Sequence, residues 1–89
     1  MASSYEVTQV SGKVKNIYYE IDNRRMKLYD EIKNISGWWK GEASNSFNTE
    51  YNKINNDITA LLNKLIELER NLKSIAVSID EYEALEEDE

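Results

Sequence analysis

The sequence predicts an all-α fold: an antiparallel two-helix hairpin that dimerises into a four-helix bundle. Apolar residues recur at helical spacing over roughly thirty residues before segment 36–41 and over roughly forty after it. That segment holds both tryptophans and two of the three glycines, which is typical of a turn between helices. The chain has no proline, so long helices can run without interruption.

Composition excludes several classes of function. The chain has 89 residues, which allows one small domain. It has no histidine and no cysteine, so it lacks the commonest general base, the commonest transition-metal ligand and any thiolate chemistry. Only surface carboxylates remain, with no pocket to tune them. We therefore expect no enzymatic activity, no catalytic residues, no cofactor or metal, and no small-molecule substrate.

The charge is unevenly distributed. The net charge is −6, and the segment 80–89 holds seven acidic residues and no basic ones. The rest of the chain is close to neutral and has no excess of basic residues that could bind phosphates, which argues against nucleic-acid binding. No apolar run is long enough to span a bilayer, and residues 1–10 lack the apolar centre of a signal peptide. We expect that any export proceeds without a cleaved signal peptide.

The first helix is predicted over about residues 4–36. Ser3 and Glu6 have the spacing of a capping box at its start. A companion apolar position holds Val10 and Ile17 but then Arg24 and Glu31. One heptad position is apolar throughout: Val7, Val14, Ile21, Leu28 and Ile35.

The turn is predicted over 37–41. Gly37 and Gly41 serve as breaks, and Gly41 can act as the N-cap of the second helix. Glu42 then places a carboxylate in the first turn, where the helix dipole favours it. Large aromatic side chains favour packing over full exposure, but the sequence leaves open whether Trp38 or Trp39 is the exposed one.

The second helix is predicted over about 42–84, followed by an acidic tail at 85–89 that should fray. Its apolar residues alternate spacings of four and three without a miss, which is typical of a heptad seam and incompatible with a strand. The first eight residues of this series are the predicted core and dimer positions: Phe47, Tyr51, Ile54, Ile58, Leu61, Leu65, Leu68 and Leu72. The series continues through Ile75, Ile79 and Tyr82.

The second helix also carries a second apolar flank, formed by Leu62, Ile66, Ala76 and Val77. One partner helix covers one seam, so this flank should need another surface. Exposure of several such side chains would forgo roughly 1.5–3 kcal/mol each. A second hairpin is the natural cover, as a homodimer or with a related partner.

Two motifs resemble those of the WXG family, small early-secreted-antigen-type proteins exported by type VII (Esx) secretion systems. Trp39 and Gly41 form the W-x-G motif at the middle of the chain, with Ala43 and Phe47 after it. Tyr82 and Glu86 match the Y-x-x-x-[D/E] motif of such substrates. The resemblance implies a secreted, non-enzymatic protein that the membrane ATPase of the system recognises. It also implies a two-part export signal, in which a dimer brings the turn of one chain toward the tail of the other.

Simpler interpretations remain for each motif. Trp39 can be a packing residue of the turn, Tyr82 an ordinary seam residue, and the acids a solvating tail.

The function that the resemblance implies is a secreted effector or interaction protein, with a role in virulence or competition. The enrichment in Asn, Ile and Lys is typical of Gram-positive bacteria with AT-rich genomes. The alternative is a co-secreted targeting partner for a larger toxin with a helical-hairpin N-terminus. A membrane-active helix is disfavoured by the mixed charges of the polar faces.

Overall fold

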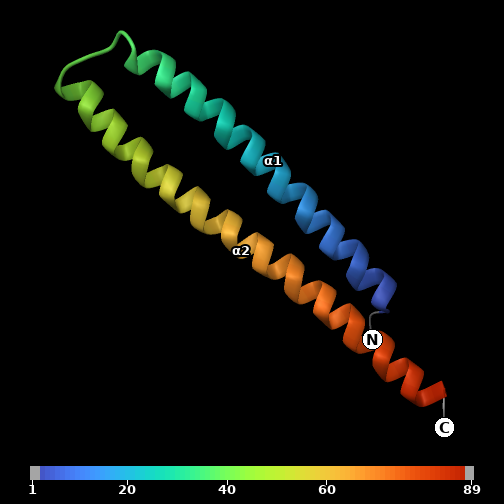
Figure 1. Cartoon of the computed structure of the whole chain (residues 1–89). Coiled ribbons are helices and arrows are strands. Elements are labelled where there is room, and N and C mark those ends of the chain that lie inside the picture. The colour runs from blue at the N-terminus through green and yellow to red at the C-terminus, as the bar shows by residue number, and fades with distance from the viewer. Residues whose placement is uncertain (1–2, 88–89) are drawn as a thin grey trace.

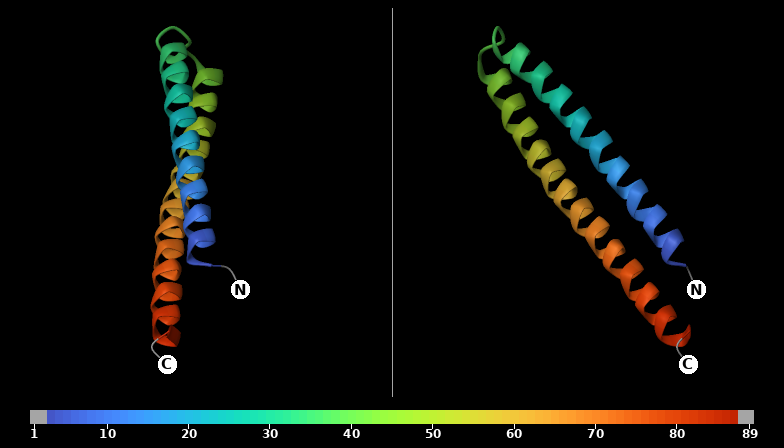
Figure 2. Two further views of the ribbon diagram at one scale, coloured as in Figure 1. Left: turned by 90° about the vertical axis from the view of Figure 1, so that its right-hand side faces the viewer. Right: turned by 45° about the vertical axis from the view of Figure 1, so that its right-hand side comes forward.

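The computed structural model describes residues 3–87 and shows two long helices joined by a short turn. Helix α1 spans Ser4–Ser36 and helix α2 spans Glu42–Glu87. They run antiparallel, so the start of α1 and the end of α2 lie at the same end of a rod that measures 73 × 16 × 15 Å (Figure 1). The two further views show the helices side by side along the whole of α1, crossing at a shallow angle (Figure 2). The predicted all-α hairpin is confirmed.

Helix α1 begins at the predicted cap. The Glu6 backbone N–H donates to the Ser3 hydroxyl oxygen at 3.2 Å, and that hydroxyl donates to the Glu6 carboxylate at 3.3 Å. The Ser3 side chain thereby satisfies a donor that has no partner within the first turn.

Helix α1 ends without a left-handed glycine. Gly37 has φ −67°, which any residue adopts, whereas Gly41 has φ 113°. Both glycines are predicted as breaks, but their backbone conformations differ. Only Gly41 needs the conformational freedom of glycine, because only its φ is positive. Its carbonyl accepts the N–H of Asn45 at 3.0 Å, the first hydrogen bond of α2. Helix α2 then continues to Glu87, three residues beyond the predicted end at 84.

The side chains that α1 and α2 bury against each other form the interhelical core. On each helix, one of the two heptad positions of this core lies one residue later than predicted. On α1, Ser11 and Val14 are buried and Tyr18 is half-buried, while the predicted companions Val10 and Ile17 are exposed. The companion position therefore lies four residues after each heptad position instead of three. A small Ser11 side chain at this position allows close approach of the two helices.

The same displacement occurs on α2. Tyr51 is buried and Ile58, Leu65 and Leu72 are half-buried, but the positions between them in the predicted series face solvent. The core is completed instead by Leu62 and Ala76, which are 5 % and 6 % exposed. The expectation that this flank needs an outside partner is therefore wrong for Leu62 and Ala76, which are buried against α1, whereas Val77 is 55 % exposed.

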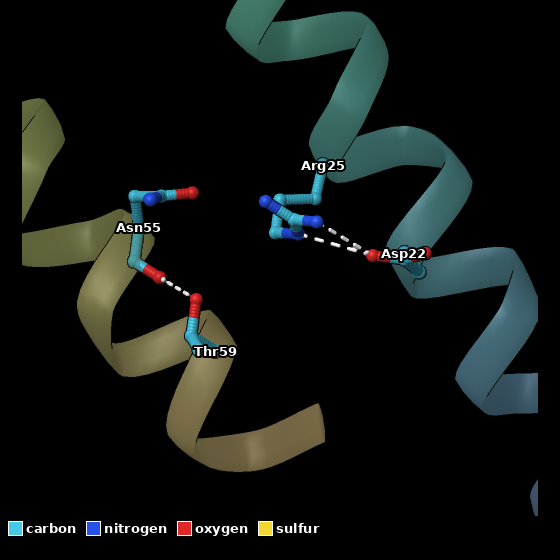
Figure 3. Close-up of polar contacts among 4 residues, drawn as sticks. All are labelled: Asp22, Arg25, Asn55 and Thr59. Carbon is cyan, nitrogen blue, oxygen red and sulfur yellow. Dashed lines mark hydrogen bonds and ion pairs between the residues drawn. The ribbon is translucent and has the colours of Figure 1, made fainter. Parts of the chain in front are cut away.

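A polar contact interrupts the core near its middle. Arg25 of α1 donates two hydrogen bonds to the Asp22 carboxylate, at 2.8 and 3.1 Å, and both side chains are half-buried. The Asn55 side chain of α2 points toward Arg25 (Figure 3). The Thr59 hydroxyl donates to the Asn55 backbone carbonyl at 2.9 Å. Polar residues inside a helical interface favour one register, because any other register would leave them against apolar side chains.

Candidate interaction surfaces

The W-x-G turn forms a small aromatic cluster at one end of the rod. The Trp39 indole lies with its ring centroid 5.6 Å from that of Phe47, at an interplanar angle of 51°. Trp39 is half-buried, whereas Trp38 is 71 % exposed. The question that the sequence left open is therefore answered: Trp39, the tryptophan of the motif, is the packed one, and Trp38 projects into solvent.

Hydrogen bonds that the sequence did not predict hold the turn in place. The hydroxyl of Ser44, a residue only 3 % exposed, donates to the Trp39 carbonyl at 2.9 Å. The Ser36 hydroxyl lies 3.4 Å from the side-chain oxygen of Asn48, which connects the end of α1 to the start of α2. The Lys40 ammonium donates to the Ser36 carbonyl at 2.7 Å. Serine, asparagine and lysine residues around a turn do not by themselves indicate which groups they bond, so these contacts required the structure.

Gly41 contributes a backbone conformation to this turn. A Cβ atom added there would meet nothing within 4 Å, so space does not exclude a side chain. The constraint is the φ of 113°, which L-residues rarely adopt. The positive φ at the start of α2 therefore explains why the last position of W-x-G is a glycine.

The second motif lies at the opposite end of the rod. Tyr82 is 58 % exposed and Glu86 is exposed as well. Both belong to the last part of α2, which extends past the start of α1 (Figure 1). With Ile75 and Ile79 they line a shallow, mostly apolar groove of about 500 Å³. One chain therefore does not bring Tyr82 and Glu86 near Trp39.

An uncovered apolar row connects these two ends along α2. Its six residues are spaced by seven, and each is between 39 % and 58 % exposed. At 100° per residue, the row lies about 80° around the helix from the centre of the interhelical core. We call it the α2 row; its members are Phe47, Ile54, Leu61, Leu68, Ile75 and Tyr82. Four of the eight predicted core and dimer positions belong to this row, and the other four face α1.

On α1, the position equivalent to the α2 row is only partly apolar. Val10 and Ile17 are exposed apolar residues there, but one and two heptads later the position holds Arg24 and Glu31. Arg24 forms a solvent-exposed ion pair with Glu20 at 3.1 Å. The free face of the hairpin is therefore continuous and apolar on α2 and mixed on α1.

The titratable groups of the described residues give no sign of a catalytic or metal site. The hydrogen bond from Lys73, at 2.8 Å, lowers the pKa of the Glu69 carboxyl, against a smaller opposing effect of burial, and the charges of Lys73 and Lys15 lower it further. Within 3–87, no cluster of three or more acidic, histidine or cysteine side chains could hold a metal ion. Neither described helix is long and apolar enough to cross a membrane.

Comparison with known proteins gives two matches. The profile of the WXG100 family, described as proteins of 100 residues with WXG, matches residues 1–84. The chain is also similar to an uncharacterised protein, YfjA, of Bacillus subtilis (strain 168). The two are 26 % identical over 81 residues, which cover 91 % of this chain and 78 % of the relative. No solved structure matches.

Proposed function

Because the chain belongs to the WXG100 family of non-enzymatic proteins secreted by type VII systems, we propose that it is exported as a homodimer and acts by binding other proteins. The observation that carries this proposal is the match to the family profile over 1–84, which includes the turn motif and most of the apolar face. This function requires no catalytic residue, cofactor or metal.

The proposed export signal has two parts, the turn with Trp39 and Gly41 and the tail with Tyr82 and Glu86. Trp39 is held in a fixed orientation by Phe47, while Tyr82 and Glu86 project into solvent, one helical turn apart, on one face of α2. A fixed aromatic and an exposed aromatic–acid pair are suited to recognition by the membrane ATPase of the secretion system. Their separation along the rod supports a role for a second copy in joining them.

Dimerisation is supported by the uncovered α2 row. Burial of a side chain such as Leu61 or Leu68 stabilises an assembly by roughly 1.5–3 kcal/mol relative to full exposure, and these side chains are already about half-covered. Six such residues on one line supply enough apolar surface for a second hairpin to pack as a four-helix bundle. Proteins of this family typically dimerise.

The test of this function measures export. Wild type, Trp39→Ala and Tyr82→Ala would be expressed in a strain with a working type VII system, and the extracellular and cellular amounts compared. The matched control is Tyr19→Ala, because Tyr19 is 57 % exposed and Tyr82 is 58 % exposed. We expect the two motif variants to remain in the cell and the control to be exported. Equal export of all variants, or export that persists without the secretion ATPase, would overturn the proposal.

A second candidate function is that of a co-secreted adaptor for a larger toxin with a similar hairpin. The observation that favours it is the mixed α1 position, because Arg24 and Glu31 would suit a related partner with complementary charges at that level. Purification separates the two candidates. A chain that is helical and dimeric by itself supports the homodimer, and one that aggregates until a second hairpin is added supports the adaptor.

A further inference from the structure

Helix α2 offers two sides on which a partner helix could pack, and α1 occupies the less apolar of them. The residues that both sides share recur every seven positions: Tyr51, Ile58, Leu65 and Leu72. On one flank of these residues lies the α2 row, in which every member is apolar. On the other flank, which α1 covers, the heptad position holds Asn48, Asn55, Leu62, Glu69 and Ala76. Apolar burial alone would favour the α2 row, so another interaction decides the side.

Two of the three polar residues at the covered position meet polar groups of α1. The Ser36 hydroxyl lies 3.4 Å from the side-chain oxygen of Asn48. Arg25 binds Asp22 through Nε and Nη2, which leaves the N–H groups of Nη1 for α2. The Asn55 side chain points toward Arg25 (Figure 3), and its Oδ1 atom is buried without a hydrogen-bond partner within residues 3–87. Asn48 and Asn55 therefore lie where α1 presents polar groups.

The third polar residue, Glu69, lies where α1 carries a positive charge. The Glu69 side chain is 18 % exposed, and its carboxylate accepts a hydrogen bond from Lys73 of the same helix at 2.8 Å. That hydrogen bond is the main cause of the lowered pKa of Glu69, and the charge of Lys15 on α1 lowers the pKa further. The attraction between Lys15 and Glu69 therefore favours the side that α1 occupies.

We propose that Asn48, Asn55 and Glu69 select the side of α2 on which α1 packs, and thereby keep the α2 row free for another chain. If the same face of α1 packed on the row, Arg25 would face apolar side chains and its remaining N–H groups would lose a polar counterpart. Polar residues at a heptad position fix one pairing of helices at a cost in stability. This inference concerns packing within one chain, so it holds whether the row binds a second copy or a related hairpin.

Replacement of the three residues by leucine makes both flanks of α2 apolar and removes the proposed selection. The polar groups of α1 keep their local partners, because Asp22 still binds Arg25 and the Ser36 hydroxyl still donates to the Ile32 carbonyl at 2.9 Å. The test variant is Asn48→Leu/Asn55→Leu/Glu69→Leu. The matched control makes the same three kinds of replacement at exposed positions of α2: Asn52→Leu/Asn56→Leu/Glu67→Leu.

A cysteine at position 62 reports the side that α1 covers, because Leu62 is 5 % exposed and the natural chain has no cysteine. Leu62→Cys would be added to the wild type, the test variant and the control, and the rate of its reaction with a maleimide measured. Urea unfolding followed by circular dichroism gives the stability of each chain. We expect the thiol to react at least tenfold faster in the test variant than in the control, at an equal or higher urea midpoint, because α1 then divides its time between two flanks.

Nuclear magnetic resonance gives a second measurement on the same chains without the cysteine. The backbone amide signals of residues 58–65 should be doubled or broadened in the test variant and single in the control. A thiol that reacts as slowly in the test variant as in the control, with a single set of amide signals, would overturn the proposal. A test variant that loses its helicity, or unfolds at lower urea than the control, would also overturn it, because the three residues would then stabilise the hairpin instead of selecting a side.

Discussion

The indole of Trp39 packs against the ring of Phe47, with 5.6 Å between the ring centroids, across the turn that joins the two helices. This contact joins the W-x-G motif to the first member of the α2 row. Phe47 itself stays 39 % exposed, so part of its side chain remains free. The turn motif is therefore a structural element of the hairpin and also one end of its uncovered apolar surface.

The two tryptophans should behave differently when they are replaced. Trp39→Ala removes a half-buried indole and its aromatic contact, and we expect it to lower the free energy of unfolding by about 1–3 kcal/mol while the hairpin stays helical. Trp38→Ala removes an exposed indole and should change the unfolding free energy by less than about 0.5 kcal/mol. Urea unfolding followed by circular dichroism measures both. Equal losses would contradict the packed position of Trp39.

Two glycines provide a matched test of backbone conformation. Gly41→Ala forces an L-residue to φ 113° and should lower the unfolding free energy by about 1–2 kcal/mol, although the side chain would have room. Gly12→Ala lies in the interior of α1, where an added Cβ also meets nothing, and should raise it by about 0.5–1 kcal/mol. Thermal unfolding of the two variants should therefore shift in opposite directions. A Gly41→Ala variant as stable as wild type would show that the turn adapts without strain.

Neighbouring leucines should separate folding from assembly. Leu62 is 5 % exposed between the two helices, so Leu62→Ala should lower the unfolding free energy by about 2–5 kcal/mol. Leu61 is 45 % exposed in the α2 row, so Leu61→Ala should chiefly weaken the dimer and leave the hairpin helical. Sedimentation and unfolding at several protein concentrations distinguish the two effects. If Leu61→Ala unfolds the hairpin as strongly as Leu62→Ala, the assignment of the α2 row to an interface between copies is wrong.

The tail motif should depend on position and not on total charge. Glu86→Ala should strongly reduce export without a change in thermal stability, because Glu86 is exposed beyond the start of α1. Glu86→Asp should be tolerated, and so should removal of 87–89, which leaves Tyr82 and Glu86 in place. Export assays on the three variants provide the comparison. An equal loss of export on removal of 87–89 would mean that bulk negative charge is recognised.

The Glu69–Lys73 pair gives a prediction for pH. Since the pair lowers the pKa of Glu69 below its usual 4.5 in the folded chain, its contribution to stability is present above that value and is lost as the pH falls through the lowered pKa. Wild type should therefore lose more stability on acidification from pH 6 to pH 3 than Glu69→Gln does. Urea unfolding across this range tests the sign. The effect should also diminish in high salt, because the Lys73 side chain is 60 % exposed.

Local sequence signals determined most of the hairpin. Ser3 with Glu6 placed the start of α1, the glycines with the tryptophans placed the turn, and the unbroken heptads predicted α2 as a helix. Each of these depends on neighbours within a few residues, where capping, backbone freedom and periodicity act. The W-x-G motif was sufficient to indicate the family that the profile match confirms.

The tertiary structure decided which apolar residues face one another. The predicted series on α2 combined residues such as Leu65, which face α1, with residues such as Leu61, which remain free, because a heptad pattern does not say which side the partner helix occupies. That side depends on contacts between residues far apart in sequence, such as the approach permitted by Ser11 and the polar pair near Asn55. The same long-range packing determined that Trp39 and not Trp38 is covered, and that Leu62 lies in the core. The sequence alone therefore determined the two helices and the turn between them, and the packing of the two helices determined which apolar surface is left for a partner.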